Sequence, residues 1–204
     1  MKQDDKNSKT VITHFDNGNI ESEYQLVDDQ VHGMYKAFYE NGMPEKQLHM
    51  KEGVLHGKYI SYYENGSVEQ ELLFKNGELD GVCIFFDKDK QKSQISKFKD
   101  NKLHGNTLIY ANGNIILLNR YKDGELNGES IGVGINNIIT ARINYKNGKK
   151  HGTTKAYSED GLSLILEENY ENDVLHGKRV VFHPKNGLVV SSEEYDMGSV
   201  VEAN

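Results

Sequence analysis

The sequence predicts an all-β fold, an elongated single-layer antiparallel β-meander built from about seven to eight β-hairpin repeats of about 24 residues. Three observations lead to this fold class. One is a recurring step, most often His-Gly, whose glycines follow one another at intervals of 23 to 25 residues: Gly33, Gly57, Gly81, Gly105, Gly128, Gly152 and Gly177. Another is an interleaved step, most often Asn-Gly, at Gly18, Gly42, Gly66, Gly113, Gly161 and Gly187. Finally, short runs of aromatic and β-branched residues fill the intervals, as strands require.

Each repeat contains two such runs. In one repeat the first run covers residues 58–63, after the His-Gly step, and the second covers residues 67–74, after the Asn-Gly step. Both runs alternate in polarity, and neither has the 3.6-residue period or the caps of a helix. The repeat is therefore a β-hairpin, and the array is an antiparallel meander.

Two kinds of turn join the runs. Glu40-Asn41-Gly42 suits a three-residue hairpin loop with the glycine at a positive φ, and this loop length sets Phe38 opposite Pro44. The other turn carries Gly53, which recurs as Gly77, Gly124, Gly148 and Gly198. Where this glycine is lost, Asp29, Asn101 and Asp173 replace it, and Asn and Asp are the residues that best tolerate a left-handed backbone after glycine.

Aligned repeats place apolar residues in three columns, which we expect to form one apolar stripe on one face. Each hairpin can bury its share of that stripe only against its neighbours. The columns are Phe38, Tyr62, Phe86, Tyr110, Val133, Tyr157 and Phe182; then Leu26, Met50, Phe74, Phe98, Tyr121, Tyr145, Tyr170 and Tyr195; then Val31, Leu55, Leu79, Leu103, Leu126 and Leu175, with Lys150 among them.

Composition restricts the classes of function. Charged residues make up 27% of the chain and the net charge is −7, which argues against nucleic acid or an anionic membrane surface as a general partner. No apolar segment is long enough to cross a bilayer. The lone Cys83 allows no internal disulfide and no cysteine zinc site. The polar N-terminus lacks the apolar core of a signal peptide, so we expect a cytoplasmic protein, or an exported one if a signal peptide has been removed.

We expect a polar N-terminal tail over residues 1–10, a continuous repeat array over residues 11–198 and a C-terminal tail over residues 199–204.

The repeat motif resembles that of the MORN-repeat variant family, which includes the YwqK-type antitoxin-like proteins. The motif is Tyr-Lys-x-Gly-x-Leu-His-Gly followed by Tyr-Tyr-Glu-Asn-Gly; residues 51–66 carry it nearly whole, and residues 121–128 and 145–152 carry its first half. The resemblance covers about residues 14–198. It implies stacked hairpins and a non-catalytic binding role, and it implies no particular partner.

Five histidines share one repeat position, which could suggest a metal site. Equivalent positions in adjacent repeats are two strands apart, about 9–10 Å, whereas zinc ligands must lie within about 3–4 Å of one another. Asp80 and Asn127 replace histidine in this column. We therefore predict that these side chains hydrogen-bond turns, and we expect no metal site, no catalytic residues and no cofactor. The histidines are His32, His56, His104, His151 and His176.

A patch of tyrosines and carboxylates in the N-terminal half is the candidate partner-binding site. Its aromatic residues alternate with Phe38 and Tyr62, so we expect them on the face opposite the apolar stripe. Tyr is favoured at protein interfaces, and acidic residues around it would steer a basic partner. Ordinary cross-strand packing is the alternative account. The predicted site residues are Tyr35, Tyr39, Tyr59, Tyr63, Phe85, Glu45 and Glu69, and the same phase contains Ile109, Glu21, Glu23 and Glu71.

The C-terminal half carries apolar residues on both expected faces, at residues 115–118, 138–139, 162 and 164–166. A single-layer sheet with two apolar faces needs a covering surface, and its open edges can pair with another chain. The leading functional hypothesis is a non-enzymatic protein-interaction module of antitoxin or immunity type, whose partner is a toxin or another basic protein. The alternatives are a self-assembling scaffold, with a homodimer as its simplest form, and a lipid-binding repeat protein. None of these involves nucleic acid or membrane insertion.

Overall fold

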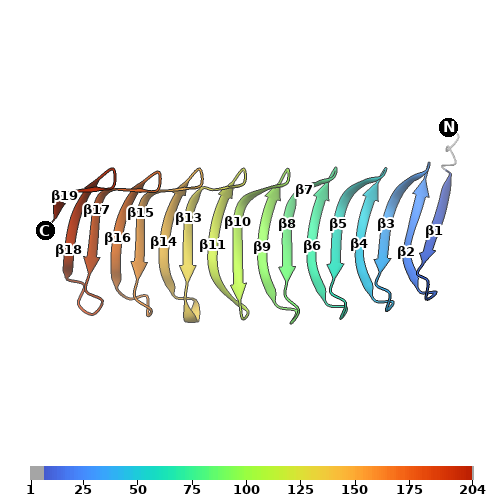
Figure 1. Cartoon of the computed structure of the whole chain (residues 1–204), viewed down its shortest axis with the longest axis horizontal. Helices are drawn as coiled ribbons and strands as arrows, with labels where there is room; N and C mark the ends of the chain where they lie inside the picture. Colours follow the sequence, from blue (N-terminus) through green and yellow to red (C-terminus); the bar gives the residue numbers. More distant parts are fainter. Residues whose placement is uncertain (1–6, 204) are drawn as a thin grey trace, which may run out of the picture. The chain divides into compact units, whose positions relative to one another are not determined.

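The computed structural model describes residues 7–203. The described chain contains nineteen strands and one 3-10 turn, and no α-helix. It divides into two units, residues 1–102 and 103–204. Within each unit the strands form a single layer and follow one another in chain order (Figure 1). The predicted all-β antiparallel meander is confirmed.

In the first unit each strand pairs antiparallel with the next strand of the chain, except that β6 pairs with both β7 and β8. The strands are β1 (Ser8–His14), β2 (Ile20–Val27), β3 (Gln30–Phe38), β4 (Pro44–Lys51), β5 (Val54–Tyr62), β6 (Val68–Lys75), β7 (Glu78–Leu79), β8 (Gly81–Phe86) and β9 (Lys92–Lys99).

The second unit has the same antiparallel pairing, and here β11 pairs with both β12 and β13. A 3-10 turn, η1 (Ile135–Asn137), occupies the loop after β13. The strands are β10 (Lys102–Ala111), β11 (Asn114–Lys122), β12 (Glu125–Leu126), β13 (Gly128–Val133), β14 (Ile139–Lys146), β15 (Lys149–Tyr157), β16 (Leu164–Glu171), β17 (Val174–Phe182), β18 (Val189–Asp196) and β19 (Ser199–Ala203).

The paired strands extend beyond the repeat array that the sequence predicts. Strand β1 begins at Ser8, and β19 pairs with β18 over residues that were expected to be a tail. Residues 1–6 and 204, which complete the two expected tails, lie outside the described residues.

The turns take the backbone conformations that the sequence predicts. The Glu40–Gly42 loop is closed by the Tyr39 N–H, which donates to the Met43 carbonyl at 2.8 Å, and Gly42 has φ +83°. Phe38 lies opposite Pro44. The turns that carry Gly53 or its equivalents have two residues with positive φ, as type I′ requires, and so does the Asn112-Gly113 turn. The turns equivalent to the Gly53 turn are Asp28-Asp29, Glu52-Gly53, Asn76-Gly77, Asp100-Asn101, Asp123-Gly124, Asn147-Gly148, Asn172-Asp173 and Met197-Gly198.

In seven of these turns, the second residue donates one backbone hydrogen bond to the preceding repeat. Gly53 donates its N–H to the Val31 carbonyl at 2.9 Å, and Gly77 donates to Leu55 at 2.8 Å. In the second unit, Gly148 donates to Leu126 at 2.8 Å. These bonds satisfy polar backbone groups at the strand ends, so each repeat stabilises the turn of the next.

The inner face of each unit is the face that carries its buried residues. In the first unit Leu48 lies directly opposite both Tyr35 and Tyr59, and directly opposed side chains share a face. Within residues 7–203 no second layer covers this face, so small side chains are buried beneath larger neighbours. The extreme case is the cross-strand pair of Cys83 and Ser96, in which both residues are 0% exposed.

This register corrects one prediction from the sequence. Met50 lies opposite Leu55, and both are on the inner face with Tyr35 and Tyr59. Two of the three predicted apolar columns therefore share a face with these tyrosines, and the expected separation of the tyrosines from the apolar stripe is wrong. The physical reason is strand alternation, because Val31 precedes Tyr35 on β3 and Leu55 precedes Tyr59 on β5 by four residues, an even separation that keeps side chains on one face. The irregular pairing near each His-Gly step, where one residue of β2 or β4 opposes three of the next strand, leaves this alternation unchanged.

Candidate functional site

A groove hollows the inner face of the first unit, and we call it the acidic groove. It consists of a larger hollow of about 900 Å³ and a smaller one of about 340 Å³, which share Tyr39 and Glu64. Five carboxylates line the two hollows, against two lysines, Lys46 and Lys88. The carboxylates belong to Glu21, Glu40, Glu45, Glu64 and Glu69, and the aromatic lining residues are Phe15, Tyr24, Tyr35, Phe38, Tyr39 and Tyr63.

Contacts within the sheet hold the aromatic rings of the groove in place. Tyr24 stacks on Tyr35 with 5.3 Å between ring centroids. The Tyr39 hydroxyl donates to the Tyr62 carbonyl in the next repeat at 2.6 Å, and the Tyr63 hydroxyl donates to the Phe86 carbonyl at 2.9 Å. Because both hydroxyls are already paired, Tyr39 and Tyr63 present fixed ring surfaces to the groove.

Three of the groove carboxylates sit at β-bulges. In the pairing of β3 with β4, Ala37 faces Lys46 and Phe38 faces Pro44, which leaves Glu45 without a cross-strand partner. Glu21 and Glu69 likewise have no cross-strand partner in the equivalent pairings of the neighbouring repeats. A bulge re-aims the side chain of the extra residue. Glu69 consequently accepts a 2.9 Å hydrogen bond from the hydroxyl of Ser61, a buried residue of the inner face.

Negative charge dominates the electrostatics of the groove. Burial, followed by the nearby carboxylates of Glu45, Glu69 and Glu64, raises the pKa of Tyr39 above its ordinary value. Burial and the Glu69 carboxylate likewise raise the pKa of Tyr63. Lys46 lies 3.4 Å from Glu45 and offsets part of this charge. The groove therefore combines fixed aromatic surfaces with an excess of carboxylates, which suits a cationic, partly apolar ligand.

The structure brings five of the seven predicted site residues to this groove. Tyr35, Tyr39 and Glu45 line the larger hollow, and Tyr63 and Glu69 join Tyr39 in the smaller one. Tyr59 instead packs edge-to-face on Phe74, with ring centroids 6.1 Å apart. Phe85 lies between Gln70 and Gln94 on the neighbouring strands and lines neither hollow.

Sequence reasoning missed several residues that line the groove: Phe15, Tyr24, Glu40 and Glu64. Glu40 and Glu64 are the first residues of their three-residue loops, and Phe15 has the same repeat position as Tyr39 and Tyr63. Alignment by repeat position, instead of strand alternation, is the signal that could have found Phe15, Glu40 and Glu64. Glu23 and Glu71 lie on the opposite face and pair with Lys36 and Lys58, at 3.2 and 2.9 Å.

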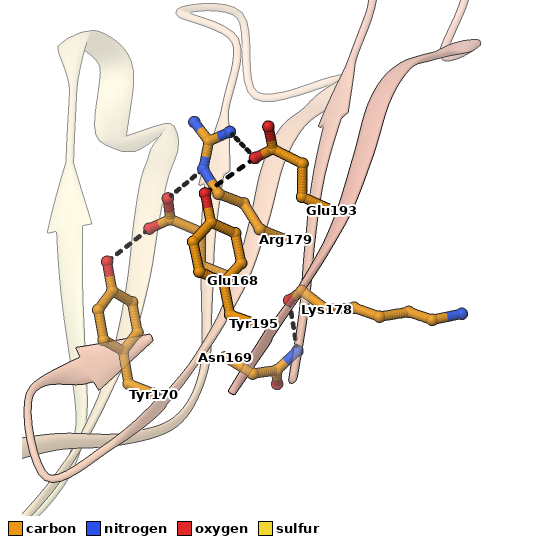
Figure 2. A network of polar contacts seen from close by, with 7 residues as sticks. All are labelled: Glu168, Asn169, Tyr170, Lys178, Arg179, Glu193 and Tyr195. Carbon is orange, nitrogen blue, oxygen red and sulfur yellow. Dashed lines mark hydrogen bonds and ion pairs between the residues drawn. The ribbon is translucent and has the colours of Figure 1, made fainter. Parts of the chain in front are cut away.

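The second unit carries charged side chains on its inner face at positions taken by apolar and aromatic residues in the first unit. The Arg179 guanidinium lies between two carboxylates, 3.0 Å from Glu168 and 3.0 Å from Glu193 (Figure 2). The Tyr170 and Tyr195 hydroxyls donate to the same carboxylates at 2.8 and 3.0 Å.

This network changes the ionisation of its tyrosines. Burial and the hydrogen bond to Glu168 raise the pKa of Tyr170 to about 12. The hydrogen bond to Glu193 and burial raise the pKa of Tyr195. The charged and hydroxyl groups of the network are hydrogen-bonded to one another across three strands, β16, β17 and β18. The network therefore links these three strands.

Three of the five column histidines lie close to a turn, and the turn hydrogen bond predicted for the column is present at His56. The Nδ1 atom of His56 lies 3.3 Å from the backbone nitrogen of Asn76, the first residue of the next type I′ turn. The Nδ1 atoms of His104 and His176 lie 3.4 Å from carboxylate oxygens of Asp123 and Asp196. Asp123 is the first residue of its turn, and Asp196 is the last residue of β18, directly before the Met197-Gly198 turn. In the described part of the chain, the buried Nδ1 atoms of His104 and His151 have no hydrogen-bond partner. Within residues 7–203, no three histidine, cysteine or acidic side chains are grouped so that they could hold a metal ion. In the same part of the chain, no helix has the length and apolar character needed to cross a membrane.

Comparison with protein families identifies the repeat. Residues 31–52 and 55–76 each match the family model described as the MORN repeat variant. These two segments include β3 to β6 and most of the acidic groove. A comparison with curated proteins gives no match.

Proposed function

Since the chain carries repeats of the MORN variant, we propose that it is a non-enzymatic protein-interaction module whose acidic groove binds a basic segment of another protein. The observation that carries this proposal is the joint presence, in one groove, of five carboxylates and of tyrosine rings whose hydroxyls are already paired. Rigid aromatic surfaces favour protein contacts because they bury a large area at little cost in conformational entropy.

The negative charge of the groove favours a partner segment with positive charge. Carboxylates that line a hollow strengthen the local field, which attracts a cationic segment and raises its association rate. The same field repels phosphate groups, so it disfavours nucleic acid and anionic lipid headgroups at this face.

An antitoxin or immunity role would be a specific form of this function. In that case the basic segment would belong to a toxin that the groove sequesters. The support for this form is the resemblance of the repeats to antitoxin-like proteins, together with a groove suited to holding a partner.

A pair of charge variants tests the proposed function. Glu45→Gln with Glu69→Gln removes two bulge carboxylates from the groove. We expect this variant to weaken binding of a labelled oligolysine peptide by about tenfold or more, in line with the loss of two partly buried charge contacts. Fluorescence anisotropy at low and at moderate salt measures the change, and added salt should weaken binding to the unmodified protein.

The matched control removes two carboxylates from the opposite face of the same sheet. Glu23→Gln with Glu71→Gln changes the net charge by the same amount but leaves the groove intact. Oligolysine affinity close to that of the unmodified protein is expected. Equal losses in the two double variants would mean that net charge alone attracts the peptide, and the proposal would then be wrong.

Self-assembly is a second candidate function, and exposed apolar residues of the second unit favour it. Leu162 and Ile135, in two loops of this unit, are 85% and 83% exposed, and Val189 and Val190 of β18 are also exposed. Sedimentation velocity over a range of concentrations should then show a dimer or a larger species that Leu162→Ser weakens. A monomer at every concentration would exclude this candidate.

A further inference from the structure

The acidic groove has a regular internal spacing. Phe15, Tyr39 and Tyr63 occupy one repeat position, and each closes its loop with an equivalent backbone hydrogen bond of 2.8 to 2.9 Å. The bulge carboxylates of Glu21, Glu45 and Glu69 occupy another position. Each repeat therefore contributes one ring and one carboxylate, and we call this pair a rung. The groove has three rungs, since Asp87 and Ser93 take the two positions in the next repeat.

The sheet sets the distance from one rung to the next. Equivalent residues lie two strands apart, and adjacent strands are 4.7–4.9 Å apart, so the rungs recur about every 9.5 Å. A polyproline II helix has three residues per turn and a rise of 3.1 Å, so its side chains recur on one side about every 9.3 Å. The two periods agree to within a few tenths of an ångström over three rungs.

Other peptide conformations fit this spacing less well. On one face of a β-strand the side chains recur about every 6.7 Å, so a side chain aligned with the first rung has no counterpart at the second rung, about 9.5 Å away. Two turns of an α-helix span about 10.8 Å, so the mismatch exceeds 2 Å by the third rung. Polyproline II segments also dock by packing on aromatic side chains, which each rung supplies.

We propose that the acidic groove recognises a polyproline II segment of about seven residues that carries a lysine or arginine at every third position. Cations at its first, fourth and seventh positions would pair with Glu21, Glu45 and Glu69, and the residues between them would pack on Phe15, Tyr39 and Tyr63. This inference rests on the proposed function, because it specifies the basic segment that the groove binds.

Two labelled peptides of identical composition test the spacing. One is Lys-Pro-Pro-Lys-Pro-Pro-Lys, and its isomer has three adjacent lysines followed by four prolines. With the whole chain we expect the spaced peptide to bind at least about tenfold more tightly, because only it can form all three charge contacts at once. Glu45→Gln with Glu69→Gln should remove this preference, whereas Glu23→Gln with Glu71→Gln should keep it.

Each other outcome overturns the inference in a distinguishable way. Equal affinity of the two isomers, lost in the Glu45/Glu69 variant, would contradict the spacing but leave the proposed function standing. Tighter binding of a third peptide, with lysine at every second position between threonines, would indicate an extended strand. Absence of binding by the spaced peptide would reject the inference, and the oligolysine measurement would then decide the proposed function separately.

Discussion

Single glycines set how closely adjacent strands of the repeat approach. Gly33 and Gly81 share the repeat position after the His column and have φ of +83° and +129°. A side chain at either position meets an unfavourable backbone conformation that costs about 1–2 kcal/mol. A Cβ added at Gly81 would also lie 2.5 Å from a methyl group of Leu73, whereas none of the surrounding atoms lies within 4 Å of one added at Gly33.

Gly81→Ala is therefore expected to lower the free energy of unfolding by clearly more than Gly33→Ala. Urea denaturation followed by circular dichroism measures both changes. Similar losses in the two variants would show that Leu73 moves aside at no cost, contrary to the close contact.

The raised pKa of the Tyr170 hydroxyl predicts that the protein becomes less stable at alkaline pH. This pKa is about 12 in the folded protein, against an ordinary value of 10.0. A raised pKa in the folded state means that the stabilisation is complete below pH 10 and is lost as the pH rises towards 12. The free energy of unfolding should thus fall over this range.

Tyr170→Phe isolates this contribution from those of the other tyrosines. The variant should be less stable than the unmodified protein at pH 9, and the difference should shrink between pH 10 and pH 12. A difference that stays constant up to pH 12 would contradict the assigned hydrogen bond to Glu168.

At the scale of elements, the type I′ turns offer a reciprocal pair of substitutions. Glu52 and Asn172 both begin a two-residue turn with φ of +51°. Asn adopts this conformation more readily than Glu. Glu52→Asn is expected to raise the melting temperature, and Asn172→Glu to lower it, with each change worth about 0.5–1 kcal/mol. Calorimetry checks both, and changes of the same sign would be inconsistent with this account.

The polar network of β16, β17 and β18 should behave as a cross-link of the second unit. Arg179→Met would leave Glu168 and Glu193 facing each other without their shared cation. The expected loss is about 1–3 kcal/mol, reduced by partial exposure. Lys155→Met, which breaks the more exposed pair with Glu167 on the other face, should cost at most about 0.5 kcal/mol. Equal costs in urea denaturation would show that the network adds nothing beyond a surface pair.

Hairpins and turns could be predicted from the sequence because they depend on local chemistry. Gly, Asn and Asp at fixed positions indicate positive φ, and the structure has positive φ at Asp29, Asn101 and Asp173. The face of each glutamate could not be predicted in this way. Glu69 and Glu71 are two residues apart, so simple alternation puts them on one face, but the bulge at Glu69 separates them. Alternation fails wherever an extra residue interrupts the pairing.

At the scale of the whole molecule, the two units use the same repeat for different surfaces. The bulge position holds glutamate at residues 21, 45 and 69 and serine at residue 93 in the first unit, and Ile116, Thr140, Ile165 and Val190 in the second. The inner face changes from Tyr35 and Leu48 to charged residues such as Arg179. The repeat fixes the backbone, and the residues at its variable positions decide what each surface can bind. The partner-binding assignment of Tyr35, Tyr39, Tyr59, Tyr63, Phe85, Glu45 and Glu69 stays a prediction.

Mapping amide chemical shifts by NMR while the spaced lysine–proline peptide is added tests the central claim most directly. The account predicts that the largest changes fall in three segments at one repeat spacing, residues 13–21, 37–45 and 61–69, and that residues 103–204 change little. Changes concentrated in the second unit, or around Glu23, Lys36, Lys58 and Glu71 on the opposite face, would contradict a binding role for the acidic groove.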